Sequence, residues 1–243
     1  MGSFERSSVD SGHLGGAIEA TRLNYGLTDT VVRDLVRQAA GQGVRAVCIP
    51  PAFVASAVAE VAACGASVEV VTVACFPMGD ASPVARRAQV TEAVEDGADH
   101  IDLVLPGALI ADRCWTELIR HIREVRLWMD EAAGSRSVAL KTILESAAWD
   151  EDRLRCAAMA AVEGGARWLK TSTGFHPAGG ATPEAVALLR GLAPEGVGVK
   201  ASGGIRTREQ AIRMLEAGAD RIGTSSEMAI LGPVSGSTGP AGL

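Results

Sequence analysis

Three lysines lie in the middle of apolar segments that have the composition of buried strands. Lys141 stands in VALKTIL, Lys170 in RWLKTSTGF and Lys200 in VGVKASG. Proteins rarely bury a lysine unless its charge is paired, so each one alone is compatible with an outward-facing or structural role. Asp102, in GADHIDLVL, occupies a similar segment. The four residues together favour one shared catalytic cavity over four separate structural roles.

A cluster of lysines has a direct chemical consequence. A partly desolvated ammonium group beside another positive charge loses its proton more easily, and its pKa can fall from about 10.4 towards about 7. The neutral amine is a nucleophile that forms a Schiff base with a carbonyl compound, and the iminium draws electrons from the adjacent carbon-carbon bond. Asp102 can act through a water molecule as general acid and base. These residues predict carbonyl chemistry on a lysine.

Glycines and small hydroxyl residues follow three of these segments. Gly203 and Gly204 come after Lys200, GTSS (223–226) ends the last segment, and Thr173 and Gly174 follow Lys170. Bare backbone amides and hydroxyls at strand ends are typical of phosphate sites in barrels. A single glycine pair is equally well explained by a tight turn, but two adjacent groups favour a phosphate site.

Eight short apolar segments alternate with helical patterns from residue 17 onward. Ser82, Thr182 and Thr207 are helix start signals, and glycines such as Gly97 and Gly218 end helices. Eight such units without a visible linker predict an α/β fold with a single domain, a (β/α)8 TIM barrel over residues 17–232. A doubly wound open sheet is the alternative, but its GxGxxG turn is absent. The expected strands are 17–23, 44–50, 68–76, 100–105, 138–144, 167–173, 197–203 and 221–226.

A weak internal repeat supports the barrel and locates the chemistry. In GVRAVC, GADHID, GARWLK and GADRIG, the fifth residue after the helix-ending glycine is Cys48, Asp102, Lys170 and Gly223 respectively. Because side chains alternate along a strand, this common register predicts a common facing, which we take to be the barrel interior.

Composition limits the class of partner and the compartment. The 243 residues carry a formal charge of −6 and no run rich in lysine or arginine, which argues against a nucleic-acid or anionic-membrane surface. The five cysteines are odd in number and form no CxxC pair, which indicates reduced thiols in a cytoplasmic protein. We expect residues 1–16 to form a flexible arm and 233–243 a flexible tail.

Several motifs, spread over residues 40–226, resemble the deoxyribose-phosphate aldolases, which are class I aldolases of the (β/α)8 fold. The resemblance is carried by GADHIDLV, LKTSTGF, VKASGGIR, CFPMGD, LKTILE and AGADRIGTSS. It implies a lyase of carbohydrate catabolism that reversibly cleaves 2-deoxy-D-ribose 5-phosphate to acetaldehyde and D-glyceraldehyde 3-phosphate, with no metal or organic cofactor. It also implies a homo-oligomer, a dimer or a tetramer.

The resemblance assigns roles to individual residues. Lys170 would form the Schiff base, Lys200 would depress its pKa, and Asp102 would take part in the proton relay. The candidate substrate-binding and phosphate-binding residues are Thr21, Lys141, Thr173, Gly174, Ser202, Gly203, Gly204, Gly223, Ser225 and Ser226.

The sequence departs from the family pattern at four places. Asp-His-Thr at the end of the first strand is Glu19-Ala20-Thr21 here, and Cys-Val-Asn-Pro is Cys48-Ile49-Pro50-Pro51. Asn-Ile-Gly after Asp102 is shortened to Pro106-Gly107, and the family's C-terminal tyrosine is missing, since Tyr25 is the single tyrosine. We expect these changes to affect the side of the pocket that orients sugar hydroxyls and relays protons, and to leave the Schiff-base lysines untouched.

Three alternatives to this aldolase stay open at the level of sequence. The first is a related enzyme of a specialised pathway that acts on a different phosphorylated aldehyde or ketone. The second is a barrel isomerase in which the lysines only stabilise an enediolate, and the third is a sugar-phosphate binder without turnover. The partner in every case is a phosphorylated small molecule.

Overall fold

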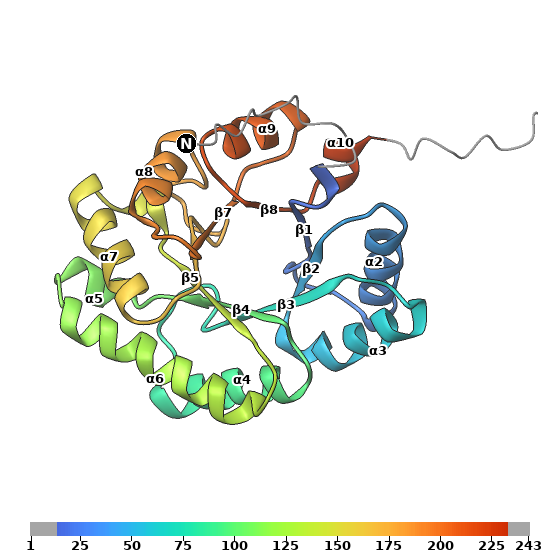
Figure 1. Ribbon diagram of the computed structural model, residues 1–243, viewed down its shortest axis with the longest axis horizontal. Coiled ribbons are helices and arrows are strands. Elements are labelled where there is room, and N and C mark those ends of the chain that lie inside the picture. Colours follow the sequence, from blue (N-terminus) through green and yellow to red (C-terminus); the bar gives the residue numbers. More distant parts are fainter. Residues whose placement is uncertain (1–13, 233–243) are drawn as a thin grey trace, which may run out of the picture.

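The computed structural model describes residues 14–232, and Figure 1 shows them as a ring of helices around a central barrel of strands. All eight expected strands form, each within the range expected from its apolar segment. The strands are β1 (Ile18–Thr21), β2 (Ala46–Ile49), β3 (Glu69–Ala74), β4 (His100–Val104), β5 (Ala139–Ile143), β6 (Trp168–Lys170), β7 (Gly198–Ser202) and β8 (Arg221–Thr224).

The strands form one closed parallel barrel in chain order. Each strand pairs with the next, and β8 pairs with β1 to close the ring. The register sets Asp102 beside Lys141 and Lys170 beside Lys200. Since all eight strands run in one direction, their carboxyl ends open at one mouth of the barrel, where active sites of this architecture lie. The expected TIM barrel is confirmed.

Helices cover the outside of the barrel. Ser82, Thr182 and Thr207 cap their helices as the sequence predicts, and Thr207 forms a capping box with Gln210. Within residues 14–232 the structure contains no helix that is long and apolar enough to cross a membrane. The helical segments are α2 (Asp29–Gly41), η1 (Pro51–Phe53), α3 (Val54–Cys64), α4 (Pro83–Glu95), α5 (Gly107–Ala111), α6 (Trp115–Ala133), η2 (Ser146–Ala148), α7 (Glu151–Glu163), α8 (Pro183–Leu192), α9 (Arg208–Glu216) and α10 (Glu227–Leu231).

Strand alternation separates two cores. On β2, Val47 and Ile49 join the large apolar cluster between strands and helices. Ala46 and Cys48, on the opposite face of β2, pack with Val71 and Val73 in a small cluster inside the barrel. Val73 pairs with Asp102 in the register, so this inner face is the one that carries the charged residues. The interior is therefore apolar on one side and charged on the other.

Side chains from the first residues of four strands close the opposite end of the barrel. The guanidinium of Arg221 lies 5.2 Å from the ring centre of Trp168 and donates to Glu69 Oε2 at 3.0 Å. His100 Nε2 lies 3.3 Å from the same carboxylate oxygen. These side chains fill the end of the barrel where the strands begin, so the barrel is open at the carboxyl ends of the strands.

The packed part of the chain begins earlier than the sequence suggested. Leu14, within the expected flexible arm, is fully buried, and its carbonyl accepts a hydrogen bond from the Ala17 amide. Burying a leucine side chain is worth about 2 kcal/mol, which explains why these residues pack against the barrel. The rest of the expected arm, residues 1–13, and the expected tail, 233–243, lie outside the described residues.

The contact between β7 and β6 gives a test of the fold. An added Cβ at Gly198 would fall within the indole of Trp168, whereas Gly191 in α8 has open space around it. We expect Gly198→Ala to lower the free energy of unfolding by about 1–3 kcal/mol through overpacking. Gly191→Ala should leave it unchanged or raise it by up to about 1 kcal/mol. Urea unfolding of both variants measures this, and equal stabilities would contradict the packing.

Candidate active site

The carboxylate of Asp102 binds all three strand lysines. Its Oδ1 accepts from Lys141 Nζ at 2.9 Å, and its Oδ2 accepts from Lys170 Nζ at 2.8 Å and from Lys200 Nζ at 2.7 Å. All four side chains are buried. The prediction that these residues share one cavity is confirmed. They meet because each side chain points into the barrel from a different one of four strands.

A second carboxylate, Glu19 of β1, belongs to the same cluster. Lys200 donates to its Oε2, and Lys141 Nζ lies 3.4 Å from its Oε1. Glu19 is fully buried, and its Oε1 accepts no hydrogen bond from any described residue. The expectation that the change at strand one leaves the lysines untouched is therefore wrong: the longer Glu19 side chain reaches directly into the lysine cluster.

The surroundings shift the proton affinities of the cluster in opposite directions. Burial opposes the charge of Glu19, but Lys141 and Lys200 outweigh it and lower the pKa of Glu19 to about 2. Burial would lower the pKa of Lys200, but Asp102 and Glu19 raise it well above its usual value. Burial lowers the pKa of Lys170, and the charge of Lys200 lowers it further against the pull of Asp102.

These shifts identify the reactive amine. Two carboxylates face three lysines, so the buried cluster is neutral when one lysine gives up its proton. The pKa of Lys200 is raised and that of Lys170 is lowered, so Lys170 is the one of this pair moved towards the neutral amine. Lys170 is thus the better nucleophile.

Gly223 makes room for this arrangement. An added Cβ at this position would lie 3.0 Å from Lys200 Cε and 3.0 Å from Ser202 Cβ. Gly223 is the fourth member of the repeated register, where the other segments carry Cys48, Asp102 and Lys170. The absence of a side chain at Gly223 therefore leaves space for the Lys200 side chain beside Glu19.

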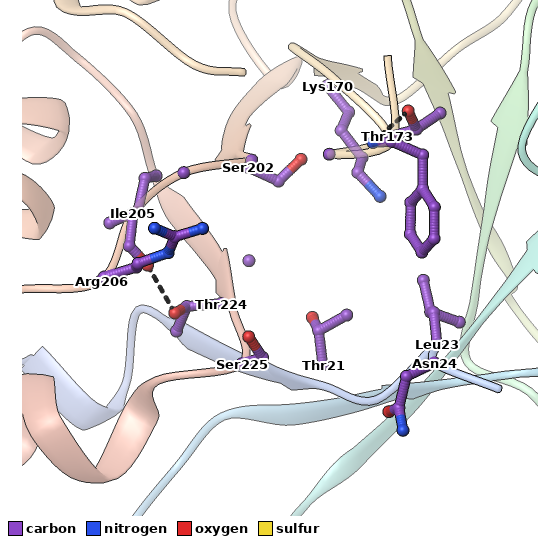
Figure 2. A pocket seen from close by; sticks show the side chains of 15 residues that line it. Thr21, Leu23, Asn24, Lys170, Thr173, Ser202, Ile205, Arg206, Thr224 and Ser225 are labelled. Carbon is purple, nitrogen blue, oxygen red and sulfur yellow. Dashed lines mark hydrogen bonds between the residues drawn. The ribbon is translucent and has the colours of Figure 1, made fainter. Parts of the chain in front are cut away.

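A pocket of about 390 Å³ opens above the cluster at the mouth of the barrel (Figure 2). Lys170 is the one cluster lysine that lines it. The other predicted residues in its wall are Thr21, Thr173, Gly174, Ser202, Gly203, Gly204, Gly223 and Ser225. Residues from four strand ends therefore surround the nucleophile.

Four of the predicted residues lie outside this wall. Asp102, Lys200 and Lys141 are buried in the cluster, and Lys141 binds Asp102 rather than lining the pocket. The amide of Ser226 donates to Thr224 Oγ1, which in turn donates to the Ile205 carbonyl. Ser226 thus holds the loop after β8 in place behind Ser225.

Three glycines let the loops after β6 and β7 approach each other closely. An added Cβ at Gly203 would lie 2.9 Å from Gly180 Cα and 3.2 Å from Gly174 Cα. Gly203 and Gly174 also have φ angles of 90° and 83°, which favour glycine. Gly174 and Gly203 both line the pocket, and neither puts a side chain into it.

Glu145 fixes the other side of this loop pair. Its Oε2 accepts hydrogen bonds from Thr173 Oγ1 at 2.6 Å and from the Thr173 amide at 3.2 Å. Both hydrogen bonds join Glu145, two residues after β5, to the loop after β6. Thr173 Oγ1 also accepts from the Phe175 amide. The Thr173–Phe175 turn is thereby held against the end of β5.

Several pocket residues were not identified from the sequence. Leu23 and Phe175 form an apolar wall, and Phe175 packs edge-on against Phe76 with ring centroids 5.2 Å apart. Arg206 lines the pocket beside the glycine loops. Figure 2 places Leu23 at one side of the pocket and Arg206 at the opposite side. The signal for Arg206 was its position directly after GGI.

The remaining departures lie around the site. Tyr25 is fully exposed, and Pro50 and Pro51 begin the short η1 turn after β2. Cys48 is buried beside the lysines, and burial raises the pKa of its thiol, which disfavours the reactive thiolate. Among residues 14–232, no three His, Cys, Asp or Glu side chains are grouped to hold a metal ion.

Glu19 gives a test of the charge cluster. Because its pKa is lowered to about 2, its charge stabilises the fold above pH 4.5, and this contribution is lost as the pH falls towards 2. Glu19→Gln leaves buried lysines short of a partner, so we expect the free energy of unfolding at pH 7 to fall by about 3–5 kcal/mol. As the pH drops below 4.5, the free energy of unfolding of this variant should also fall less than that of the wild type.

The matched control is Glu19→Asp, which keeps the charge. Its free energy of unfolding should still decline at acid pH as in the wild type. Urea unfolding between pH 7 and pH 3 measures both variants. An unchanged pH dependence in Glu19→Gln would show that Glu19 carries no buried charge.

Comparisons with known proteins agree with this geometry. Residues 7–236 match the family described as DeoC/LacD family aldolase. The chain is 42% identical over 227 residues to a deoxyribose-phosphate aldolase of Micrococcus luteus, covering 93% of this chain and 98% of the relative. It is 37% identical to a deoxyribose-phosphate aldolase of Corynebacterium jeikeium, covering 96% of this chain and all of the relative.

A solved structure gives the same result. The deoxyribose phosphate aldolase of Aeropyrum pernix, described as having a unique tetrameric structure, superposes with a TM-score of 0.82 at 31% identity over 91% of both chains. The sequence match, the barrel and the lysine cluster together lead to one conclusion: this chain belongs to the DeoC/LacD family of aldolases.

Proposed function

We propose that this protein cleaves 2-deoxy-D-ribose 5-phosphate reversibly into acetaldehyde and D-glyceraldehyde 3-phosphate through a Schiff base on Lys170. The observation that carries this proposal is the position of Lys170, whose amine is bound to Asp102, faces the pocket and has a lowered pKa. The names of the Micrococcus luteus and Corynebacterium jeikeium relatives support this substrate.

The chemistry follows from a neutral amine at this position. Lys170 Nζ attacks C1 of the open-chain sugar, water leaves, and an iminium forms. A base removes the proton of the C3 hydroxyl, the C2–C3 bond breaks, and its electrons move into the enamine as glyceraldehyde 3-phosphate departs. Protonation of the enamine at C2 and hydrolysis of the imine release acetaldehyde and restore the amine. No electrons are gained or lost overall.

Asp102 and Lys200 are suited to the proton transfers. Asp102 Oδ2 accepts a hydrogen bond from Lys170 and another from Lys200, so the three groups are in direct contact. We propose that Asp102 moves protons through a water molecule between the substrate and this cluster. Lys200 keeps its charge and thereby favours the neutral form of Lys170.

We propose that the substrate phosphate binds at the end of the pocket formed by Gly174, Gly203, Gly204, Ser225 and Arg206. All five residues line the pocket, and they offer backbone amides, a hydroxyl and a guanidinium to an anion. The apolar wall at the other end suits the carbon chain of the aldehyde. This orientation places C1 near Lys170, between the two ends.

Two coarser properties complete the proposal. We propose a homo-oligomer, supported by the tetrameric title of the Aeropyrum pernix neighbour. We also propose a cytoplasmic location, supported by the five free cysteines.

Covalent trapping tests the nucleophile. Sodium borohydride added with 2-deoxyribose 5-phosphate should reduce the imine to a stable adduct, and peptide mass mapping should find it on Lys170. Lys170→Met should abolish the adduct and lower kcat/KM by more than about 10³-fold, because the covalent route is lost.

Trapping with acetaldehyde alone separates the chemistry from the substrate. An adduct with acetaldehyde but none with the sugar phosphate would keep the Schiff-base mechanism and assign a different phosphorylated aldehyde or ketone. No adduct with either compound, in folded protein, would refute the aldolase mechanism. Binding of the sugar phosphate without turnover would indicate a binding protein.

The pH dependence of trapping tests the lowered pKa of Lys170. Since imine formation needs the neutral amine, its rate should rise with pH through a midpoint below the 10.5 of an ordinary lysine. Lys200→Met removes the positive charge that lowers the pKa of Lys170, so the midpoint should move to higher pH. An unchanged or lower midpoint in this variant would contradict the electrostatic role of Lys200.

A further inference from the structure

A half-buried ion pair links the segments that follow β1 and β8, the two strands that close the barrel. The guanidinium of Arg22, directly after β1, donates through Nη1 to Glu227 Oε2 at 3.1 Å and through Nη2 to Glu227 Oε1 at 2.5 Å. Glu227 follows β8 and is 3% exposed. A two-pronged contact of this kind fixes orientation as well as distance.

The same guanidinium also contacts backbone carbonyls of residues that line the pocket. Arg22 Nη1 donates to the Thr21 carbonyl at 2.9 Å and lies 3.5 Å from the Ser225 carbonyl. Thr21 and Ser225 both line the pocket. Arg22 therefore links the end of β1 to the loop after β8, across the seam where the barrel closes.

Glu227 places a negative charge two residues after Ser225, which lines the pocket. A buried carboxylate without a partner would repel an incoming phosphate dianion, since charges in a poorly hydrated site interact strongly. Arg22 neutralises that charge and, at the same time, holds the Ser225 carbonyl. The pair thus acts on both the charge and the shape of the site.

We propose that Arg22 and Glu227 are positioning residues for the phosphate end of the active site. Arg22 holds the loop 223–226 against β1 and cancels the charge of Glu227, so that the site accepts a phosphorylated substrate. This inference rests on the proposed function, which places the substrate phosphate at this end.

Two single variants should have effects of unequal size and direction. Arg22→Met leaves Glu227 buried and unpaired, so KM for 2-deoxyribose 5-phosphate should rise by about tenfold or more, with kcat little changed. Glu227→Gln keeps a hydrogen-bond acceptor and leaves Arg22 with an uncancelled positive charge, so KM should stay the same or fall. A purely structural role would impair both variants alike.

Controls separate the phosphate effect from general damage. With 2-deoxyribose, which has no phosphate, Arg22→Met should change KM by less than about threefold. The double variant Arg22→Met/Glu227→Met removes both charges and should restore KM for the phosphorylated substrate to within a few fold. Arg155→Met removes one partner of the exposed Arg155–Glu151 pair on α7 and should have no effect.

Binding of inorganic phosphate distinguishes this proposal from the proposed function. Titration calorimetry with phosphate alone needs no turnover, and Arg22→Met should weaken binding while Glu227→Gln should not. This result would support the pair even if no aldol cleavage were found. Equal phosphate affinity in wild type and folded Arg22→Met would overturn the proposal. If Arg22→Met does not fold, weaker phosphate binding by Glu227→Gln would overturn it as well.

Discussion

The carboxylate of Asp102 is the centre on which the catalytic end of this barrel depends. It accepts hydrogen bonds from lysines on β5, β6 and β7, three successive strands that run side by side. Three lysines could not share one dry cavity without it, because their mutual repulsion and their desolvation act in the same direction. Every other feature of the site either completes this charge balance or positions the substrate above it.

Glu19 completes the balance and explains an apparent departure from the family pattern. A carboxylate stands at the end of β1 in the family pattern as well, and here it carries one more methylene. The additional length is accommodated because β8 offers Gly223 beside Lys200, so that the Lys200 side chain and Glu19 meet within the barrel. The charges of Asp102 and Glu19 raise the pKa of Lys200, and the charge of Lys200 helps to lower the pKa of Lys170.

The pocket above the cluster has two distinct ends, and each follows from a different physical requirement. The loops after β6 and β7 pack so closely that their glycines leave no room for side chains. Backbone groups without side chains are suited to the anion that we propose to bind here. Leu23 and Phe175 give the pocket an apolar wall, and Phe76 packs behind Phe175. Lys170 lines the same pocket, where in the proposed function it meets the substrate carbonyl.

The sequence alone determined the barrel, its eight strands and the inward facing of Asp102, Lys170 and Lys200, because strand alternation and capping are local patterns. It also indicated eight of the residues that line the pocket beside Lys170. The tertiary structure decided that Glu19 joins the lysines, that Lys141 stays buried, and that Arg22 pairs with Glu227. Glu19 and Lys200 are 181 positions apart, and Arg22 and Glu227 are 205 apart. Arg22 and Glu227 meet because β8 pairs with β1, and Glu19 reaches Lys200 of β7 past Gly223 of β8. No local pattern in the sequence records which side chains meet where the barrel closes.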